Sequence, residues 1–186
     1  MTCRHALLSD APAVAELHAD SWRRNYRGAY LDSYLDGDVE TDRLEVWIDR
    51  LSLIDTGRFT LVAEEDGVVV GFVHTILDED PVWGAYLENL HVAHHLKARG
   101  IGRRLVAAAA RELVERRPAS GLYLWVLEQN TAAQAFYEAL GGERRGRELR
   151  GPFPGGGQAF GLRYAWPDPS EICAIGGDRL RRGHPD

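Results

Sequence analysis

One stretch, residues 88–105, constrains this chain more than any other, because it places glycines and cations between an apolar strand and an Ala/Arg-rich helix. The residues of the turn are Lys97, Arg99, Gly100, Gly102 and Arg103. Glycine lets a backbone approach a ligand closely. A helix N-terminus presents unpaired N–H groups at the positive end of a dipole. The stretch therefore predicts a turn that binds a diphosphate.

The spacing of the glycines narrows the choice of ligand. A P-loop needs Gly, four residues and then Gly-Lys-Ser/Thr, and the chain has no such run. A dinucleotide fingerprint needs a third small residue where Leu105 stands. This spacing argues against a nucleotide-binding regulatory domain. A structural alternative remains for the turn alone, which is a Gly-rich helix start with solvated charges.

The composition sets outer limits. The 186 residues suit one domain, and a net charge of −6 argues against general nucleic-acid binding. No apolar run approaches the roughly 20 residues of a membrane span, and the N-terminus lacks the apolar core of a signal peptide. Two cysteines, Cys3 and Cys173, are too few for a disulfide framework. We therefore expect a cytoplasmic protein with neither a nucleic-acid nor a membrane partner.

Hydrophobic periodicity and turn signals predict the elements along the chain. Helices are expected from Ser9-Asp10-Ala11-Pro12 onward and over 41–53, 101–116 and 131–140. Strands are expected over 4–8, 59–65, 68–77, 84–92, 122–127, 143–150 and 158–166, with Asp66-Gly67 as a hairpin turn. Residues 1–166 are predicted to form one domain, and 167–186 a Pro/Gly/Arg-rich tail.

Two motifs resemble a known family. The run Lys97-Ala98-Arg99-Gly100-Ile101-Gly102 resembles the acetyl-CoA pyrophosphate loop of the GNAT superfamily of N-acetyltransferases, whose pattern is Arg/Gln-x-x-Gly-x-Gly/Ala. Lys97 departs from it, because a lysine keeps the charge but lacks the planar fork of arginine. The run 124–127, followed by Asn130, Ala133, Phe136 and Tyr137, resembles the strand–helix unit that packs on the pantetheine arm and thiol. The order of elements also follows this family over 1–166.

The resemblance implies an α/β fold of GNAT type, with a mixed, mostly antiparallel central sheet and helices on both faces. It implies an acetyl-CoA-dependent N-acetyltransferase of bacterial type, with acetyl-CoA as co-substrate, no metal, and a small-molecule or peptide amine as acceptor. It also allows a homodimer through the C-terminal strands. The alternative is a non-catalytic acyl-CoA-binding sensor of the same fold. The implied cofactor-binding residues are Leu90, Val92, Lys97, Arg99, Gly100, Ile101, Gly102, Arg103, Asn130, Ala133 and Phe136.

Glu88 is the candidate general base, because acetyl transfer needs a neutral amine and the family often has a carboxylate near this point of the strand. Strand alternation predicts that Tyr86, Glu88 and Leu90 share one face. The rival base, His91, is then expected on the opposite face. A purely structural role for Glu88, an ion pair with an arginine, is also open. The histidines at 91, 94 and 95 lack the companions of a metal site.

Tyr137 is the candidate general acid. Its phenol stays protonated at neutral pH and can donate to a leaving thiolate, although an aromatic on a short helix is also typical of core packing. Neither Tyr137 nor Glu88 has a cysteine near it in the sequence, which favours direct attack in a ternary complex over an acyl-cysteine.

The acceptor side is less defined. We expect Trp22, Tyr26 and Trp125 around the acceptor, although the four-residue spacing of Trp22, Tyr26 and Tyr30 also suits core packing. A nearby acidic stretch either attracts a cationic amine or is a solvated loop; it contains Asp32, Asp36 and Asp38. The sequence does not identify the amine.

Overall fold

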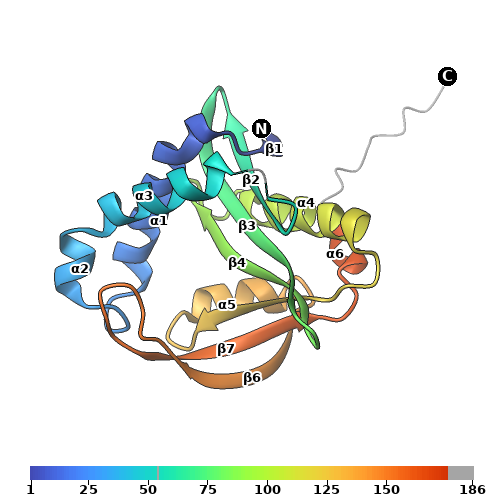
Figure 1. The fold of residues 1–186 in the computed structure, drawn as a ribbon. Helices are drawn as coiled ribbons and strands as arrows, with labels where there is room; N and C mark the ends of the chain where they lie inside the picture. The colour runs from blue at the N-terminus through green and yellow to red at the C-terminus, as the bar shows by residue number, and fades with distance from the viewer. Residues whose placement is uncertain (54, 176–186) are drawn as a thin grey trace.

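The computed structural model describes residues 1–53 and 55–175, and it shows a central sheet with helices on both faces (Figure 1). Within these ranges the seven strands follow the order β1-β2-β3-β4-β5-β7-β6. Every neighbouring pair is antiparallel except β4–β5. The strands are β1 (Thr2–His5), β2 (Arg58–Glu65), β3 (Val68–Asp80), β4 (Gly84–Val92), β5 (Leu122–Leu127), β6 (Glu143–Arg150) and β7 (Ala159–Trp166). The predicted mixed, mostly antiparallel sheet is confirmed.

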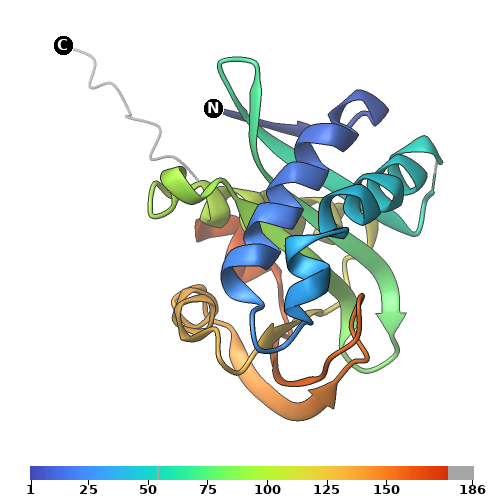
Figure 2. The same cartoon turned by 90° about the vertical axis from the view of Figure 1, so that its left-hand side faces the viewer.

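Helices α1 and α3 pack on one face of the sheet, and α4 with α6 packs on the other; Figure 2 shows α1, α2 and α3 in front of the strands. The helices are α1 (Ala11–Asn25), α2 (Asp32–Asp36), α3 (Val39–Ser52), α4 (Ile101–Arg116), α5 (Thr131–Glu138) and α6 (Ser170–Ile175), with 3-10 turns η1 (Leu8–Asp10) and η2 (His94–Leu96). In the described ranges no helix combines the length and the apolar character that a bilayer crossing needs.

Each large helix forms because its apolar residues recur every three or four positions and face the sheet. The buried stripe of α4 consists of Ile101, Leu105, Val106, Ala107, Ala109, Ala110 and Leu113. The buried stripe of α1 consists of Ala11, Val14, Ala15, His18, Ala19 and Trp22. The α4 stripe packs in one core cluster with Leu87 of β4, and the α1 stripe divides between two smaller clusters.

Strands β4 and β5 part soon after they meet. Their parallel pairing is limited to Ala85 with Leu122 and Tyr86 with Tyr123. Beyond these pairs the side of β4 that faces β5 has no strand partner along Leu87–Val92. The split opens the middle of the sheet, and it is the feature that positions the candidate site.

Strand β4 also contains a bulge. Its partner β3 pairs His74 with Asn89 and Thr75 with Leu87, which leaves Glu88 as an extra residue. A bulge shifts the alternation of side chains beyond it. Glu88 therefore lies at an irregular point of the strand, next to the split.

The C-terminal segment corrects the expected tail. Residues Ser170–Ile175 form α6, which packs on α4, and Ile172 is fully buried in the core cluster. The packed region thus continues past 166. Residues 176–186 of the expected tail lie outside the described residues. A second element that the sequence analysis missed is α2, in the stretch rich in aspartate.

Candidate active site

A cavity of about 610 Å³, here called the first cavity, opens where β4 and β5 separate. It lies between the turn before α4 and the helix α5. Ten of the eleven predicted cofactor-binding residues line it: Leu90, Val92, Lys97, Gly100, Ile101, Gly102, Arg103, Asn130, Ala133 and Phe136. Both candidate catalytic residues, Glu88 and Tyr137, line it as well.

The turn before α4 has the backbone that the glycines suggested. Gly100 is the N-cap of α4 in a left-handed conformation, with φ +81°, and no side chain caps the helix start. A Cβ at this position would meet no atom within 4 Å, so the turn has free space at this point. Gly102 differs, because a Cβ there would lie 3.4 Å from the Phe136 ring. Gly102 therefore lies against a neighbouring side chain, whereas Gly100 faces open space.

The cations of the turn divide into two groups. Lys97 and Arg103 are exposed, line the first cavity and form no ion pair within the described part of the chain. Arg99 does not line the cavity, because its guanidinium lies 3.4 Å from a carboxylate oxygen of Glu65 on β2. A diphosphate fits this helix start, which offers uncapped N–H groups and two cations.

Two residues of α5 face the same cavity. Asn130 caps the helix, since its Oδ1 accepts a hydrogen bond of 3.2 Å from the Ala133 N–H, and it also lines the cavity. Tyr137 is 9% exposed, and burial raises the pKa of its phenol, so the hydroxyl keeps its proton at neutral pH. A buried, protonated phenol beside the cavity is a competent proton donor.

A second cavity of about 420 Å³ lies on the α1/α3 side of the split. Its walls come from α1, α3, β4, β5 and the loop that joins β6 to β7. The predicted acceptor residues Trp22, Tyr26 and Trp125 all line it. The other aromatic lining residues are Tyr30, Tyr86 and Phe153. Trp22 is only 5% exposed, so it serves the core and the cavity together.

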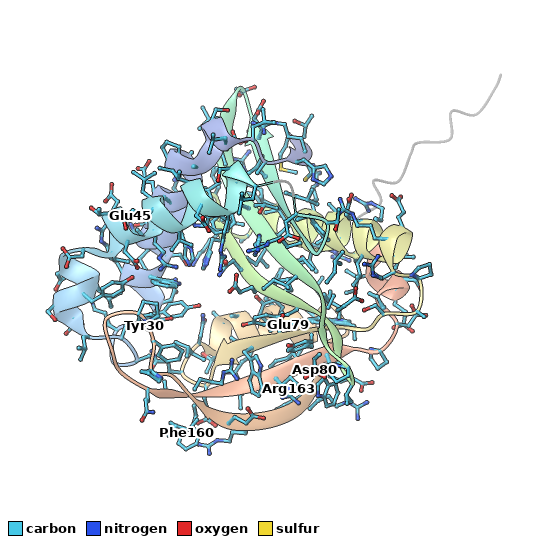
Figure 3. All side chains as sticks on the ribbon, viewed as in Figure 1. Tyr30, Glu45, Glu79, Asp80, Phe160 and Arg163 are labelled. Carbon is cyan, nitrogen blue, oxygen red and sulfur yellow. The ribbon has the colours of Figure 1, made fainter. Side chains whose placement is uncertain are left out.

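The aromatic wall of the second cavity joins distant parts of the chain. Tyr30 stacks on Phe153 with ring centroids 4.5 Å apart. Figure 3 shows Tyr30 beside the loop between β6 and β7, while Phe160 lies on the outer side of this hairpin. Asp32 and Asp36 do not line the cavity, since both pair with Arg27. The aspartates of α2 are therefore exposed and ion-paired, as in the solvated alternative, although they lie on a short helix and not on a loop.

The two cavities meet at four residues that line both: Tyr26, Glu88, Trp125 and Val126. Glu88 is the one carboxylate among these four residues. Arg50 of α3 holds it with two hydrogen bonds, 2.6 Å from Nη1 to Oε2 and 3.1 Å from Nη2 to Oε1. Sequence reasoning missed Arg50, because no motif links it to a residue 38 positions away.

The bulge in β4 overturns the predicted faces. Leu87 and Leu90 both pack in the α4 cluster, whereas Glu88 pairs with α3 and His91 contacts α1. Glu88 and His91 therefore face the same helical layer, and the expectations that they lie opposite and that Leu90 shares the Glu88 face were wrong. The alternation rule fails here because the extra residue shifts every later side chain.

His91 is a weak candidate for the base. Burial lowers its pKa to about 3, its Nδ1 lies 2.8 Å from the Ser21 hydroxyl oxygen, and its ring lies tilted against that of His18, with the centroids 4.7 Å apart. A base with so low a pKa takes up a proton poorly at neutral pH. His94 and His95 are exposed on η2, and no group of residues suited to a metal ion is found in the described ranges.

Comparisons with known proteins agree with this geometry. The model of the Acetyltransferase (GNAT) family matches residues 12–142. The uncharacterized N-acetyltransferase YuaI of Bacillus subtilis is 32% identical over 146 residues, 77% of this chain and 81% of that protein. The ribosomal-protein-alanine N-acetyltransferase of Brucella melitensis has a TM-score of 0.68 at 26% identity, covering 89% of this chain and 99% of that one. The PaiA N-acetyltransferase of Thermoplasma acidophilum, solved with coenzyme A, has a TM-score of 0.68 at 19% identity, covering 89% and 98%.

Proposed function

Because this chain belongs to the Acetyltransferase (GNAT) family and is an acetyl-CoA-dependent acyltransferase, we propose that it acetylates a primary amine by direct attack, with both substrates bound at once. The observation that carries this proposal is the meeting of two cavities at Glu88. One cavity suits the donor and the other the acceptor.

The first cavity supplies the donor site. The N–H groups at the start of α4, with Lys97 and Arg103, would bind the diphosphate. The main chain of Leu90 and Val92, free on its β5 side, would bind the pantetheine arm as an added strand. Acetyl-CoA, when bound, supplies the acetyl group as a thioester. These assignments agree with the residues that line the cavity.

Two side chains would handle protons. The Glu88 carboxylate would accept the proton that the amine loses as its nitrogen attacks, and the Tyr137 hydroxyl would donate a proton to the departing sulfur. The raised pKa of Tyr137 supports its role, because the phenol is protonated before the thiolate leaves. Arg50 would have to release at least one oxygen of Glu88 for the base to work.

The ion pair between Arg50 and Glu88 is also the observation that favours the alternative function. In the structure both carboxylate oxygens of Glu88 are engaged by Arg50, which is what a purely structural ion pair looks like. An acyl-CoA-binding module without turnover would need the first cavity and no base. The second, open cavity beside Glu88 supports the enzyme, since such a module has no use for it.

A thiol-release assay distinguishes these functions. The purified protein is incubated with acetyl-CoA and a panel of primary amines, and free thiol and acetylated product are measured. We expect amine-dependent release that Glu88→Gln largely abolishes. Glu40→Gln, a matched change at an exposed α3 residue paired with Arg23, should leave the rate unchanged. Binding of acetyl-CoA without thiol release from any amine would favour the binding module.

A further inference from the structure

The second cavity has a surplus of positive charge, although the whole chain has a net charge of −6. Three arginines, Arg43, Arg50 and Arg150, line it, and Glu88 is the one carboxylate among its described lining residues. His18 also lines it, but burial lowers its pKa well below the ordinary value, so the ring is neutral. A cationic hollow in an acidic protein attracts an anionic ligand.

One of the three arginines is already neutralised. Both terminal nitrogens of Arg50 donate hydrogen bonds to the two oxygens of Glu88. A third contact of 3.3 Å runs from its Nη1 to Oδ1 of Asn89. Arg50 and Glu88 therefore cancel in charge inside the cavity. Arg43 also pairs with a carboxylate, Asp42, but Asp42 does not line the cavity, so the surplus among the lining residues lies on Arg43 and Arg150.

Arg43 keeps a donor without a partner. The residue is 8% exposed, and its guanidinium lies 4.5 Å from the centre of the Trp22 ring. Its Nη2 donates to Asp42 over 2.7 Å, but its buried Nε has no hydrogen-bond partner among the described residues. Leaving a buried donor unsatisfied is costly. The Nη1 of Arg43 also donates no hydrogen bond to the described residues and, unlike Nε, is accessible, so it is the donor that a ligand in the cavity can reach.

Arg150, at the end of β6, is the least engaged of the three. Its guanidinium lies 4.6 Å from the centre of the Trp125 ring, at the junction of the two cavities. The nearest acid, Glu148, is 3.8 Å away and accepts a hydrogen bond of 3.2 Å from Arg163 instead. In the described part of the chain the Arg150 guanidinium donates no hydrogen bond. Its planar fork is thus available for a carboxylate or phosphate.

We infer that the acceptor is a small primary amine that carries an anionic oxygen group, bound by Arg150 and Arg43 while its nitrogen faces Glu88. This inference rests on the proposed function, since it names the substrate class of the same site. The volume of about 420 Å³ suits a molecule of about amino-acid size. The aromatic walls would pack the remainder of such a molecule.

Matched acceptors test the inference, because each pair differs by the anionic group. The pairs are L-phenylalanine with 2-phenylethylamine, 4-aminobutyrate with propylamine, and L-serine or O-phosphoethanolamine with ethanolamine. We expect kcat/KM to be at least tenfold higher for the anionic member of at least one pair. The ethanolamine set shows whether the preferred group is a carboxylate or a phosphate.

Variants connect the preference to Arg150. In Arg150→Gln the ratio of kcat/KM between the two members should fall toward one, and Arg150→Lys should retain part of it. The ratio cancels differences in amine basicity, since each pair is measured in every variant at one pH. Arg147→Gln is the matched control, because Arg147 also lies on β6 but pairs with Glu128 outside the cavity. It should keep both the ratio and the rates.

The same probes are also tested for binding in the presence of coenzyme A by ligand-observed NMR. An anionic preference in turnover that Arg150→Gln removes would support the inference. Equal or better use of the neutral amines would overturn it and leave the proposed function intact. If no probe releases thiol, an Arg150-dependent binding preference would still support the anion site while the proposed function fails. Absence of that preference would overturn the inference.

Discussion

The two cavities differ in how the chain builds them. The first comes from two short strand–helix units, β4–α4 and β5–α5, whose lining residues fall mainly within 87–103 and 124–137. The second draws on α1, α3, β4 and the β6–β7 loop, from His18 to Gly161. A site made of contiguous segments leaves motifs in a sequence. A site assembled from many segments is visible only after the chain has folded.

The cavities also differ in how far their cationic side chains are exposed to solvent. Lys97 and Arg103 of the first cavity are exposed and solvated. The arginines of the second cavity, Arg43, Arg50 and Arg150, are buried or half-buried, and their guanidiniums lie over the rings of Trp22, Trp47 and Trp125. Buried polar groups respond more strongly to removal than solvated ones. We therefore expect substitutions in the second cavity and at the junction to have larger effects than substitutions in the diphosphate turn.

The largest effect is expected at the junction. Glu88→Gln keeps the shape and removes the basicity, so kcat should fall roughly 10²-fold or more while acetyl-CoA affinity hardly changes. The acidic limb of the pH–rate profile should flatten as well. Steady-state kinetics and calorimetry measure these quantities. A parental kcat in Glu88→Gln would transfer the role to His91, to a water chain or to the substrate itself.

Tyr137→Phe removes one oxygen and keeps the packing on α5. We expect kcat to drop roughly 10- to 100-fold, because the donated hydrogen bond strengthens only as charge builds on sulfur. An acetyl thioester with a better-leaving thiol should restore much of the rate. If the variant matches the parent with both thioesters, Tyr137 is a packing residue of the first cavity.

The diphosphate turn is tested best at Gly100. In Gly102→Val the Cβ would lie 3.4 Å from the Phe136 ring and the two methyl groups would extend beyond it. A loss of affinity in that variant would therefore combine a packing effect with a binding effect. Gly100→Val should weaken acetyl-CoA binding about tenfold, or about 1.4 kcal/mol, by calorimetry. Gly141→Val is the matched control, because Gly141 has a similar φ of +80° and equally open surroundings away from both cavities. Equal affinities in the two variants would remove the turn from the cofactor site.

Acid should destabilise the fold where β3 and β4 pack on α1 and α3, because His74 contacts Trp47 there and His91 contacts Ser21. Burial lowers the pKa of both His74 and His91 to about 3, below the ordinary value of 6.5. The unfolded chain then binds more protons, so stability falls as the pH drops from about 6.5 toward 3, by about 1.4 kcal/mol per pH unit for each ring. Urea unfolding should show a shallower pH slope in His91→Gln. The exposed His94→Gln should keep the parental slope; an identical slope in both variants would refute the assignment.

The smallest effect is expected at Lys97. Lys97→Ala should bind acetyl-CoA a few-fold more weakly at low salt, with the gap closing as salt rises, because the charge is exposed and screened. Lys97→Arg should bind like the parent. A difference in affinity between Lys97→Ala and the parent that persists unchanged in high salt would indicate a buried, specific contact. The cations of the two cavities would then differ less in their exposure to solvent than the structure indicates.

Prediction from sequence succeeded where local rules decide the structure. The bounds of β4, α4, β5 and β6 match the predicted ranges, because Gly84, Gly100 and apolar runs mark the first three and Gly142 and Gly151 flank the polar β6. The bulge at Glu88 was missed, since an extra residue in one strand shows only against its partner. The sequence allowed an arginine partner for Glu88 but did not identify it as Arg50, since that depends on how α3 lies on the sheet. Ile172 was missed because a single apolar turn among polar residues resembles a tail.

The central claim, that donor and acceptor occupy their two cavities together at Glu88, is tested most directly by initial velocities with both substrates varied. Simultaneous occupancy predicts that double-reciprocal lines intersect, because the amine attacks only after both sites are filled. Product inhibition by coenzyme A at fixed amine would provide a consistency check. Parallel lines would mean that the acetyl group leaves acetyl-CoA before the amine binds, and they would contradict the account.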